Sequence, residues 1–191
     1  MTTTTKEEEE EEEEEENNTN TTTISLVPFT ADYIEIYASW FTNDPELYEQ
    51  TATDVNATDW TFVQKEIERD ERTNHYLIKI DRTNEIIGDV CVYEIPNDDD
   101  MDNEESGYRP IGELTVMIGD RTKRRKGLAK KAVEMMLEKV EQKFEAVVVK
   151  IAEDNQNSRK LFERVNGFVY VRDGAANVFG DVELRRETKP L

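Results

Sequence analysis

The stretch Arg124-Arg125-Lys126-Gly127-Leu128-Ala129 lies where a strand-like segment meets an amphipathic helix. Residues 114–118 before it alternate as a strand does. The residues after it place apolar side chains on one helical face: Ala129, Val133, Met136, Leu137, Val140 and Phe144. The N–H groups at a helix start carry partial positive charge and bind anions, and Gly127 has no side chain to keep an anion away. The stretch therefore predicts a phosphate-binding turn, although it lacks the Gly-x-x-x-x-Gly-Lys spacing of a Walker loop.

The charge of the chain limits its partners. The 191 residues suffice for one domain with a core, and the formal net charge is −20. A chain this acidic repels the phosphates of nucleic acids and of anionic membranes, so we expect neither as a partner. The basic residues at 121–131 then form a local positive site for a polyanion, because screening over about 8 Å at physiological salt lets nearby charges dominate distant ones.

The same composition indicates a reducing compartment. Cys91 is the only cysteine, so no internal disulfide can form. No apolar run approaches the roughly 20 residues of a membrane span, and the acidic start lacks the features of a signal peptide. We expect a cytoplasmic protein, while the basic run 121–126 leaves nuclear import open. The only histidine, His75, lacks a second ligand nearby in the sequence, so we expect no metal site.

The order of predicted elements indicates an α+β fold. Residues 1–23 contain ten consecutive glutamates and nothing to bury, which predicts a disordered acidic tail before a domain over 24–191. Strands are predicted at 24–27, 76–81, 86–94, 112–118 and 146–151, with a final antiparallel pair at 168–172 and 178–185. Helices are predicted over 30–41, where Thr30 is the expected cap, and over 59–71, 127–143 and 157–167, and an acidic loop over 96–110.

Three blocks of sequence resemble the GNAT acyltransferase superfamily. The pattern Arg124-x-x-Gly127-x-Ala129 resembles its acetyl-CoA pyrophosphate loop. Residues 155–168 resemble its Asn-x-x-Ser-x-x-Leu-Tyr-x-x-x-Gly-Phe segment. Residues 26–30 with Trp40 and 44–46 are similar to the branch that acetylates ribosomal-protein N-termini, of the RimJ and RimL kind. Within that branch, residues 112–118 and 178–184 look closest to the eukaryotic N-acetyltransferase nine group.

The resemblance implies a fold and a cofactor site. It implies a mixed, mostly antiparallel sheet flanked by helices, in which the strands at 112–118 and 146–151 splay apart and bind acetyl-CoA. The residues implied for acetyl-CoA are Met117, Ile118, Gly119, Arg124, Arg125, Lys126, Gly127, Leu128, Ala129 and Asn155. For Met117 and Ile118 the expected contact is through the backbone, and for Asn155 the alternative is a helix cap.

Glu113 is the predicted general base. The alternation of a strand places Glu113, Thr115 and Met117 on one face, directed at one side of the expected cofactor gap. A glutamate there can take the amine proton directly or through water. The alternative is a carboxylate that only orders the strand end or steers a cationic amine.

The general acid, which would protonate the departing thiolate, is the second catalytic group to be assigned. The resemblance implies a tyrosine after Leu161 that protonates the departing thiolate, and this chain has Phe162 there. Ser158 is the remaining hydroxyl of that block and becomes the candidate to orient or protonate the sulfur. Its alternative is helix capping.

These observations predict transfer of an acetyl group from acetyl-CoA to a primary amine. A lysine amine costs roughly 4.6 kcal/mol to deprotonate at pH 7, whereas an α-amine costs roughly 1–1.4 kcal/mol, so a modest carboxylate suits an α-amine of a protein or peptide better. The acidic surface favours a cationic acceptor. The alternatives are a small metabolite amine as acceptor and a non-catalytic protein of the same fold that binds a basic partner. The sequence does not predict an oligomeric state.

Overall fold

The structure is a computed structural model that describes residues 22–51, 60, 73–95, 110–172 and 181–188. Three sequence predictions lie mainly outside these ranges: the tail over 1–23, the helix over 59–71 and the acidic loop over 96–110. The boundary between an acidic tail and a domain at residue 24 therefore stays a prediction.

A seven-stranded sheet forms the centre of the described fold, with strand order β1-β2-β3-β4-β5-β7-β6. All neighbouring strands pair antiparallel except β4 and β5, which are parallel. The predicted antiparallel pair at the end of the chain is β6 with β7. The strands are β1 (Ile24–Pro28), β2 (Thr73–Ile80), β3 (Ile86–Ile95), β4 (Ile111–Ile118), β5 (Ala146–Ala152), β6 (Val169–Arg172) and β7 (Asp181–Glu187).

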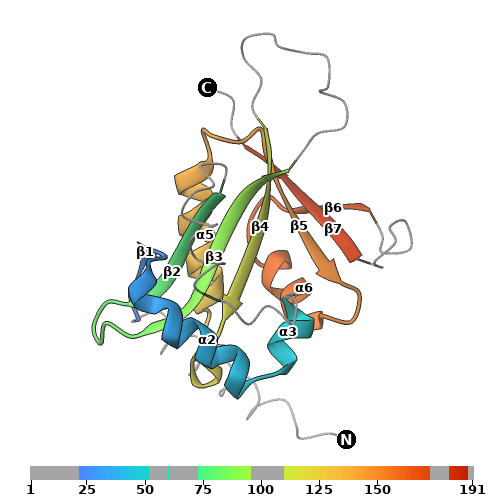
Figure 1. Cartoon of the computed structure of the whole chain (residues 1–191). Coiled ribbons are helices and arrows are strands. Elements are labelled where there is room, and N and C mark those ends of the chain that lie inside the picture. Colours follow the sequence, from blue (N-terminus) through green and yellow to red (C-terminus); the bar gives the residue numbers. More distant parts are fainter. Residues whose placement is uncertain (1–21, 52–59, 61–72, 96–109, 173–180, 189–191) are drawn as a thin grey trace, which may run out of the picture.

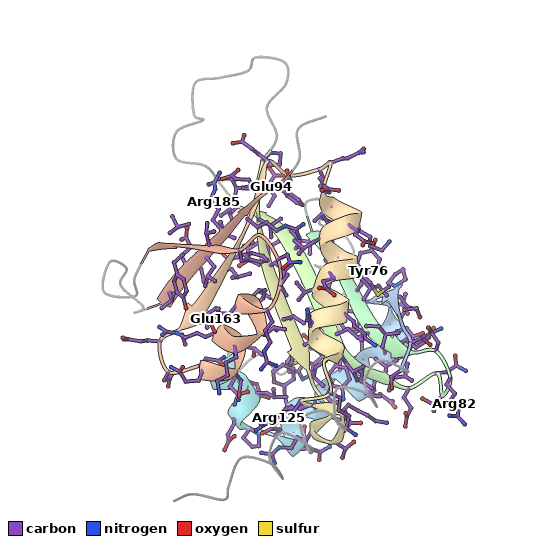
Figure 2. The ribbon with its side chains drawn as sticks, turned by 180° about the vertical axis from the view of Figure 1, so that it is seen from behind. Tyr76, Arg82, Glu94, Arg125, Glu163 and Arg185 are labelled. Carbon is purple, nitrogen blue, oxygen red and sulfur yellow. The ribbon has the colours of Figure 1, made fainter. Side chains whose placement is uncertain are left out.

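Helices cover both faces of this sheet (Figure 1). On the face toward the viewer in Figure 1 lie α2 (Ile34–Asn43) and α3 (Glu46–Gln50). On the opposite face, which Figure 2 turns forward, lie α5 (Leu128–Val140) and α6 (Gln156–Glu163). Short 3-10 turns, η1 (Ala31–Tyr33) and η3 (Arg121–Lys123), precede α2 and α5. This architecture confirms the predicted mixed, mostly antiparallel α+β fold.

Two apolar clusters show toward which face of the sheet the side chains of β4 point. The cluster under α5 contains Leu114 and, packed against it, Val116 and Ile118. The cluster under α2 contains Met117 together with Trp40. Leu114 and Met117 therefore point to opposite faces, as the predicted alternation of this strand requires.

Several local predictions differ from the structure. Thr30 makes no side-chain cap; its carbonyl instead accepts a hydrogen bond from the Tyr33 N–H at 3.1 Å, which starts a 3-10 turn before α2. The short helix α3 was not predicted, because the Asp44-Pro45 break masks a fresh helix start. The helix predicted over 157–167 ends at Glu163, and Gly167 has φ +94° in the turn that leads to β6.

Candidate active site between β4 and β5

The pairing of β4 with β5 stops halfway along both strands. Their register covers only residues 111–113 against 146–148, so Glu113 and Val148 form the last pair. We call this last pair the vertex, and the space between the two strands beyond it the gap. Beyond the vertex, β5 continues to pair with β7 and β4 continues to pair with β3. Figure 1 shows β4 and β5 separating toward the end where α5 begins. The predicted splay is thus confirmed, and it leaves backbone groups of residues 114–118 without a strand partner on one edge.

The predicted phosphate turn lies at the open end of this gap. Gly127 is the N-cap of α5 with φ +70°, and Arg125 is also left-handed with φ +62°. The first backbone N–H of α5 that reaches a carbonyl belongs to Lys131, which bonds Gly127 at 3.2 Å. The N–H groups of residues 128–130 therefore have no helical acceptor and point out of the helix end. Such a turn is a concave donor site for an anion.

Arg124 stabilises the turn through contacts with the end of β4 and with Asp44. Its Nε donates to the Ile118 carbonyl at 2.8 Å, and its Nη1 lies 2.8 Å from Oδ2 of Asp44. Asp44 is only 2% exposed and also pairs with Nε of Arg121 at 3.1 Å. Both arginines are thus held by one buried carboxylate at the end of α2, and Arg124 connects the turn to β4.

The other cations of the cluster are also partly engaged. Lys123 pairs with Glu85 at 2.9 Å, and Nζ of Lys131 donates to the Thr22 carbonyl at 3.0 Å. Arg125 and Lys126 are exposed, and in the described part of the chain neither makes an ion pair. Figure 2 shows Arg125 at the start of α5. These two side chains are therefore available to a phosphate.

The backbone at the end of β4 divides between the gap and the neighbouring strand. A Cβ built on Gly88 of β3 would lie 2.1 Å from the Met117 carbonyl oxygen, so that carbonyl faces β3. Successive carbonyls of a strand point to opposite edges, which directs the backbone of Val116 and Ile118 at the gap. The Ile118 carbonyl already accepts from Nε of Arg124, so a ligand on this edge would share that carbonyl or use the Ile118 N–H, whereas the carbonyl of Met117 faces away from the gap.

Gly119 has a packing role that the sequence did not reveal. A Cβ on this residue would lie 2.0 Å from Cδ2 of Trp40, whose indole is buried under the sheet. The absence of a side chain at Gly119 lets the Trp40 ring pass over the backbone.

Glu113 lies at the vertex and is buried among polar partners. Its side chain is 11% exposed, on the sheet face covered by α2. Nζ of Lys150 on β5 donates to its Oε2 at 2.5 Å. Tyr93 on β3, which is opposite Glu113 in the register, also hydrogen-bonds it. Burial raises the pKa of the Tyr93 phenol, and the bond to Glu113 raises it further, so Tyr93 stays protonated near neutral pH and donates this hydrogen bond to Glu113.

The second motif block forms a capped helix. Oδ1 of Asn155 accepts the backbone N–H of Ser158 at 3.1 Å, so Asn155 is the N-cap of α6. The capping alternative for Asn155 is confirmed, and the Ser158 hydroxyl does not provide that cap. Phe162 is buried, with its ring edge-on to Phe168 at 5.2 Å between centroids. Phe162 is thus part of the core under α5 and α6.

A second polar group lies buried on the same face as Glu113. Nε2 of His75 lies 2.7 Å from Oδ2 of Asp89, and the Tyr37 hydroxyl donates to the same oxygen at 3.4 Å. Burial raises the pKa of Tyr37, with the Asp89 carboxylate as the next cause. These contacts explain why a polar histidine is tolerated beneath α2, and Cys91, opposite His75, is buried as predicted.

Three partners in this site were absent from the sequence-based predictions: Lys150, Tyr93 and Asp44. Lys150 had a detectable signal, because it is the one charged residue in the apolar segment Ala146–Ala152. Alternation with buried Val149 and Ile151 places it on the opposite face, beside Glu113. Asp44 and Tyr93 had no such signal, because only packing brings them to their partners.

Comparison with known proteins identifies this arrangement. The acetyltransferase (GNAT) domain family matches residues 23–169. The chain therefore belongs to the GNAT family and is an N-acetyltransferase. It is 30% identical over 177 residues to an N-acetyltransferase 9-like protein of Dictyostelium discoideum, which covers 86% of this chain and 82% of the relative.

Solved structures share the fold at low sequence identity. Mycobacterium smegmatis RimJ in complex with a CoA disulfide has a TM-score of 0.66 at 14% identity, covering 86% of this chain and 81% of the other. Spermidine N-acetyltransferase from Vibrio cholerae, in complex with CoA and spermine, has a TM-score of 0.65 at 13% identity, covering 85% of this chain and 92% of the other.

Among the helices that the structure describes, none has the length and apolar character of a membrane span.

Proposed function

We propose that this N-acetyltransferase transfers the acetyl group of acetyl-CoA to the N-terminal α-amine of a protein or peptide. The observation that carries the proposal is the position of Glu113. Its carboxylate lies at the vertex where β4 and β5 stop pairing, and the anion-binding turn lies at the open end of the same gap.

The chain fits acetyl-CoA at both ends of the gap. The left-handed Gly127, the N–H groups of residues 128–130 that have no helical acceptor, and the side chains of Arg125 and Lys126 suit a pyrophosphate. The gap edge of β4 suits the amides of the pantetheine arm, which pair with free backbone groups as an added strand does. From residue 118 back to residue 113 the strand spans about 16 Å, at about 3.3 Å per residue. This direction brings the thioester toward Glu113.

The chemistry requires a neutral amine beside the thioester. Acetyl-CoA supplies an activated acetyl group, and no covalent bond to the enzyme is needed, so orientation contributes much of the rate. Glu113 takes the proton from the attacking amine, directly or through water. Because an α-amine costs only roughly 1–1.4 kcal/mol to deprotonate at pH 7, against roughly 4.6 for lysine, a carboxylate suffices for the former.

The acceptor is a cationic peptide in a cytoplasmic setting under this proposal. The net charge of −20 attracts basic segments, which raises their local concentration. RimL, a ribosomal L7/L12 α-N-protein acetyltransferase whose structure shares this fold with a TM-score of 0.66 at 14% identity, supports a protein acceptor. The similarity to a spermidine acetyltransferase makes a polyamine the competing class.

One experiment separates these acceptors. Labelled acetyl-CoA is offered with a library of N-terminal peptides, with the same peptides blocked at the N-terminus but carrying lysine, and with spermidine. Mass spectrometry should find acetylation on free N-termini, and most on basic sequences. Acetylation of spermidine alone would replace the proposed acceptor, and no product with any amine would favour the non-catalytic alternative.

A further inference from the structure

Lys150 occupies an unusual place in the sheet. It is the only charged residue of β5, and its side chain is 42% exposed on the face of the sheet that carries Glu113. Its ammonium reaches across the last β4–β5 pair to the Glu113 carboxylate. The reactive end of the gap therefore contains a lysine already bound to the predicted base.

This ion pair changes what Glu113 offers to an acceptor. A lone buried carboxylate attracts any ammonium, whereas a carboxylate that already accepts from Lys150 and Tyr93 has its charge compensated. A charged acceptor amine must displace Lys150 before it can bind Glu113, and it meets a like charge while doing so. A neutral amine meets neither obstacle, because it needs only a hydrogen-bond acceptor for its proton.

The populations of neutral amine are very different for the acceptor classes. With reference pKa values of about 7.7–8.0 for an α-amine and about 10.4 for lysine, roughly one α-amine in ten but only about one lysine in 2,500 is neutral at pH 7. A site that rejects ammonium thus discriminates by about two orders of magnitude without touching any other part of the acceptor.

We propose that Lys150 is a specificity-determining residue, which compensates Glu113 and thereby restricts the site to amines that are neutral near pH 7. This inference rests on the proposed acetyl transfer to α-amines and names the residue that selects them over lysine and polyamines. Lys150 is a positioning residue, because it acts through Glu113.

The sheet offers matched controls for this role. Lys79 on β2 is the other lysine in the described strands, and two strand positions separate it from the gap. Glu183 on β7 lies directly opposite Lys150 in the register, on the side away from Glu113. A change at Lys79 tests loss of a strand lysine, and a change at Glu183 tests loss of a nearby carboxylate.

The test is a selectivity ratio. For each variant, kcat/KM is measured at pH 7 with a peptide that has a free N-terminus and no lysine, and with an N-terminally blocked peptide that has one lysine. Lys150→Met should lower the ratio of the first value to the second at least 10-fold. Lys150→Arg keeps the charge and should retain most of the ratio. Lys79→Met and Glu183→Gln should leave it within about 2-fold of the wild type.

A second readout needs no turnover. Titration calorimetry in the presence of CoA measures the affinity of the blocked lysine peptide, which should rise at least 5-fold in Lys150→Met and stay unchanged in Lys150→Arg. A structural defect would lower both kcat/KM values together and leave their ratio constant, which would overturn the inference while the proposed function stands. Wild-type enzyme that acetylates no α-amine would instead overturn the proposed function.

Discussion

Replacement of Gly119 by alanine should separate its packing role from a role in cofactor binding. The added Cβ would lie 2.0 Å from Cδ2 and 2.4 Å from Cγ of Trp40. The indole is 6% exposed and packs among Phe41 and Met117, so it cannot swing into solvent. Overpacking of this kind costs roughly 2–3 kcal/mol. At about 2–4 °C per kcal/mol for a chain of this size, the melting temperature should fall by about 4–12 °C.

The assay is thermal unfolding of the wild type, Gly119→Ala, Trp40→Leu and the double variant. The smaller side chain at residue 40 makes room for the new methyl group, so the double variant should be more stable than the sum of the two single effects implies, by about 1 kcal/mol or more. Additive effects would contradict the packing explanation. A Gly119→Ala protein with an unchanged melting temperature but weakened acetyl-CoA binding would show that Gly119 serves the cofactor instead.

Four further outcomes are expected. Gly127→Glu should abolish acetyl-CoA binding in titration calorimetry, because a carboxylate would occupy the phosphate turn; unchanged affinity would remove the cofactor assignment. Glu113→Gln should lower turnover about 10²–10⁴-fold with nearly constant acetyl-CoA affinity, because the amine proton loses its acceptor; equal turnover in both proteins would refute the base role. Tyr93→Phe should cost roughly 1 kcal/mol of stability in a denaturant titration, because the hydrogen bond to Glu113 is lost. Its pH–rate profile between pH 6 and 9 should match that of the wild type, because burial and Glu113 raise the pKa of this phenol above that range. A shifted profile would give Tyr93 a role in proton transfer. Deletion of residues 1–21 should preserve both melting temperature and turnover, and a large loss of either would show that the acidic segment is structural.

Local patterns were sufficient for most of the fold. The alternation at 112–118, the helical periodicity after Gly127 and the glycine itself are properties of neighbouring residues, so they could be read in order along the chain. Together they predicted the turn at the start of α5 and the face on which Glu113 lies. The capping rule failed at Thr30, because its carbonyl accepts the Tyr33 N–H and this backbone hydrogen bond turns the chain before α2.

The sequence by itself therefore determined the strands, the helices α2, α5 and α6, the cationic turn and the family to which the blocks belong, because periodicity, glycine placement and short motifs act over a few residues. Only the tertiary structure decided what the side chains of the site are bound to. It assigned Arg124 to Asp44 and gave Gly119 the ring of Trp40. It joined Lys150 to Glu113, 37 positions away. Strand order and packing decide these partners, and a contact between residues far apart in the chain produces no periodic pattern in the sequence.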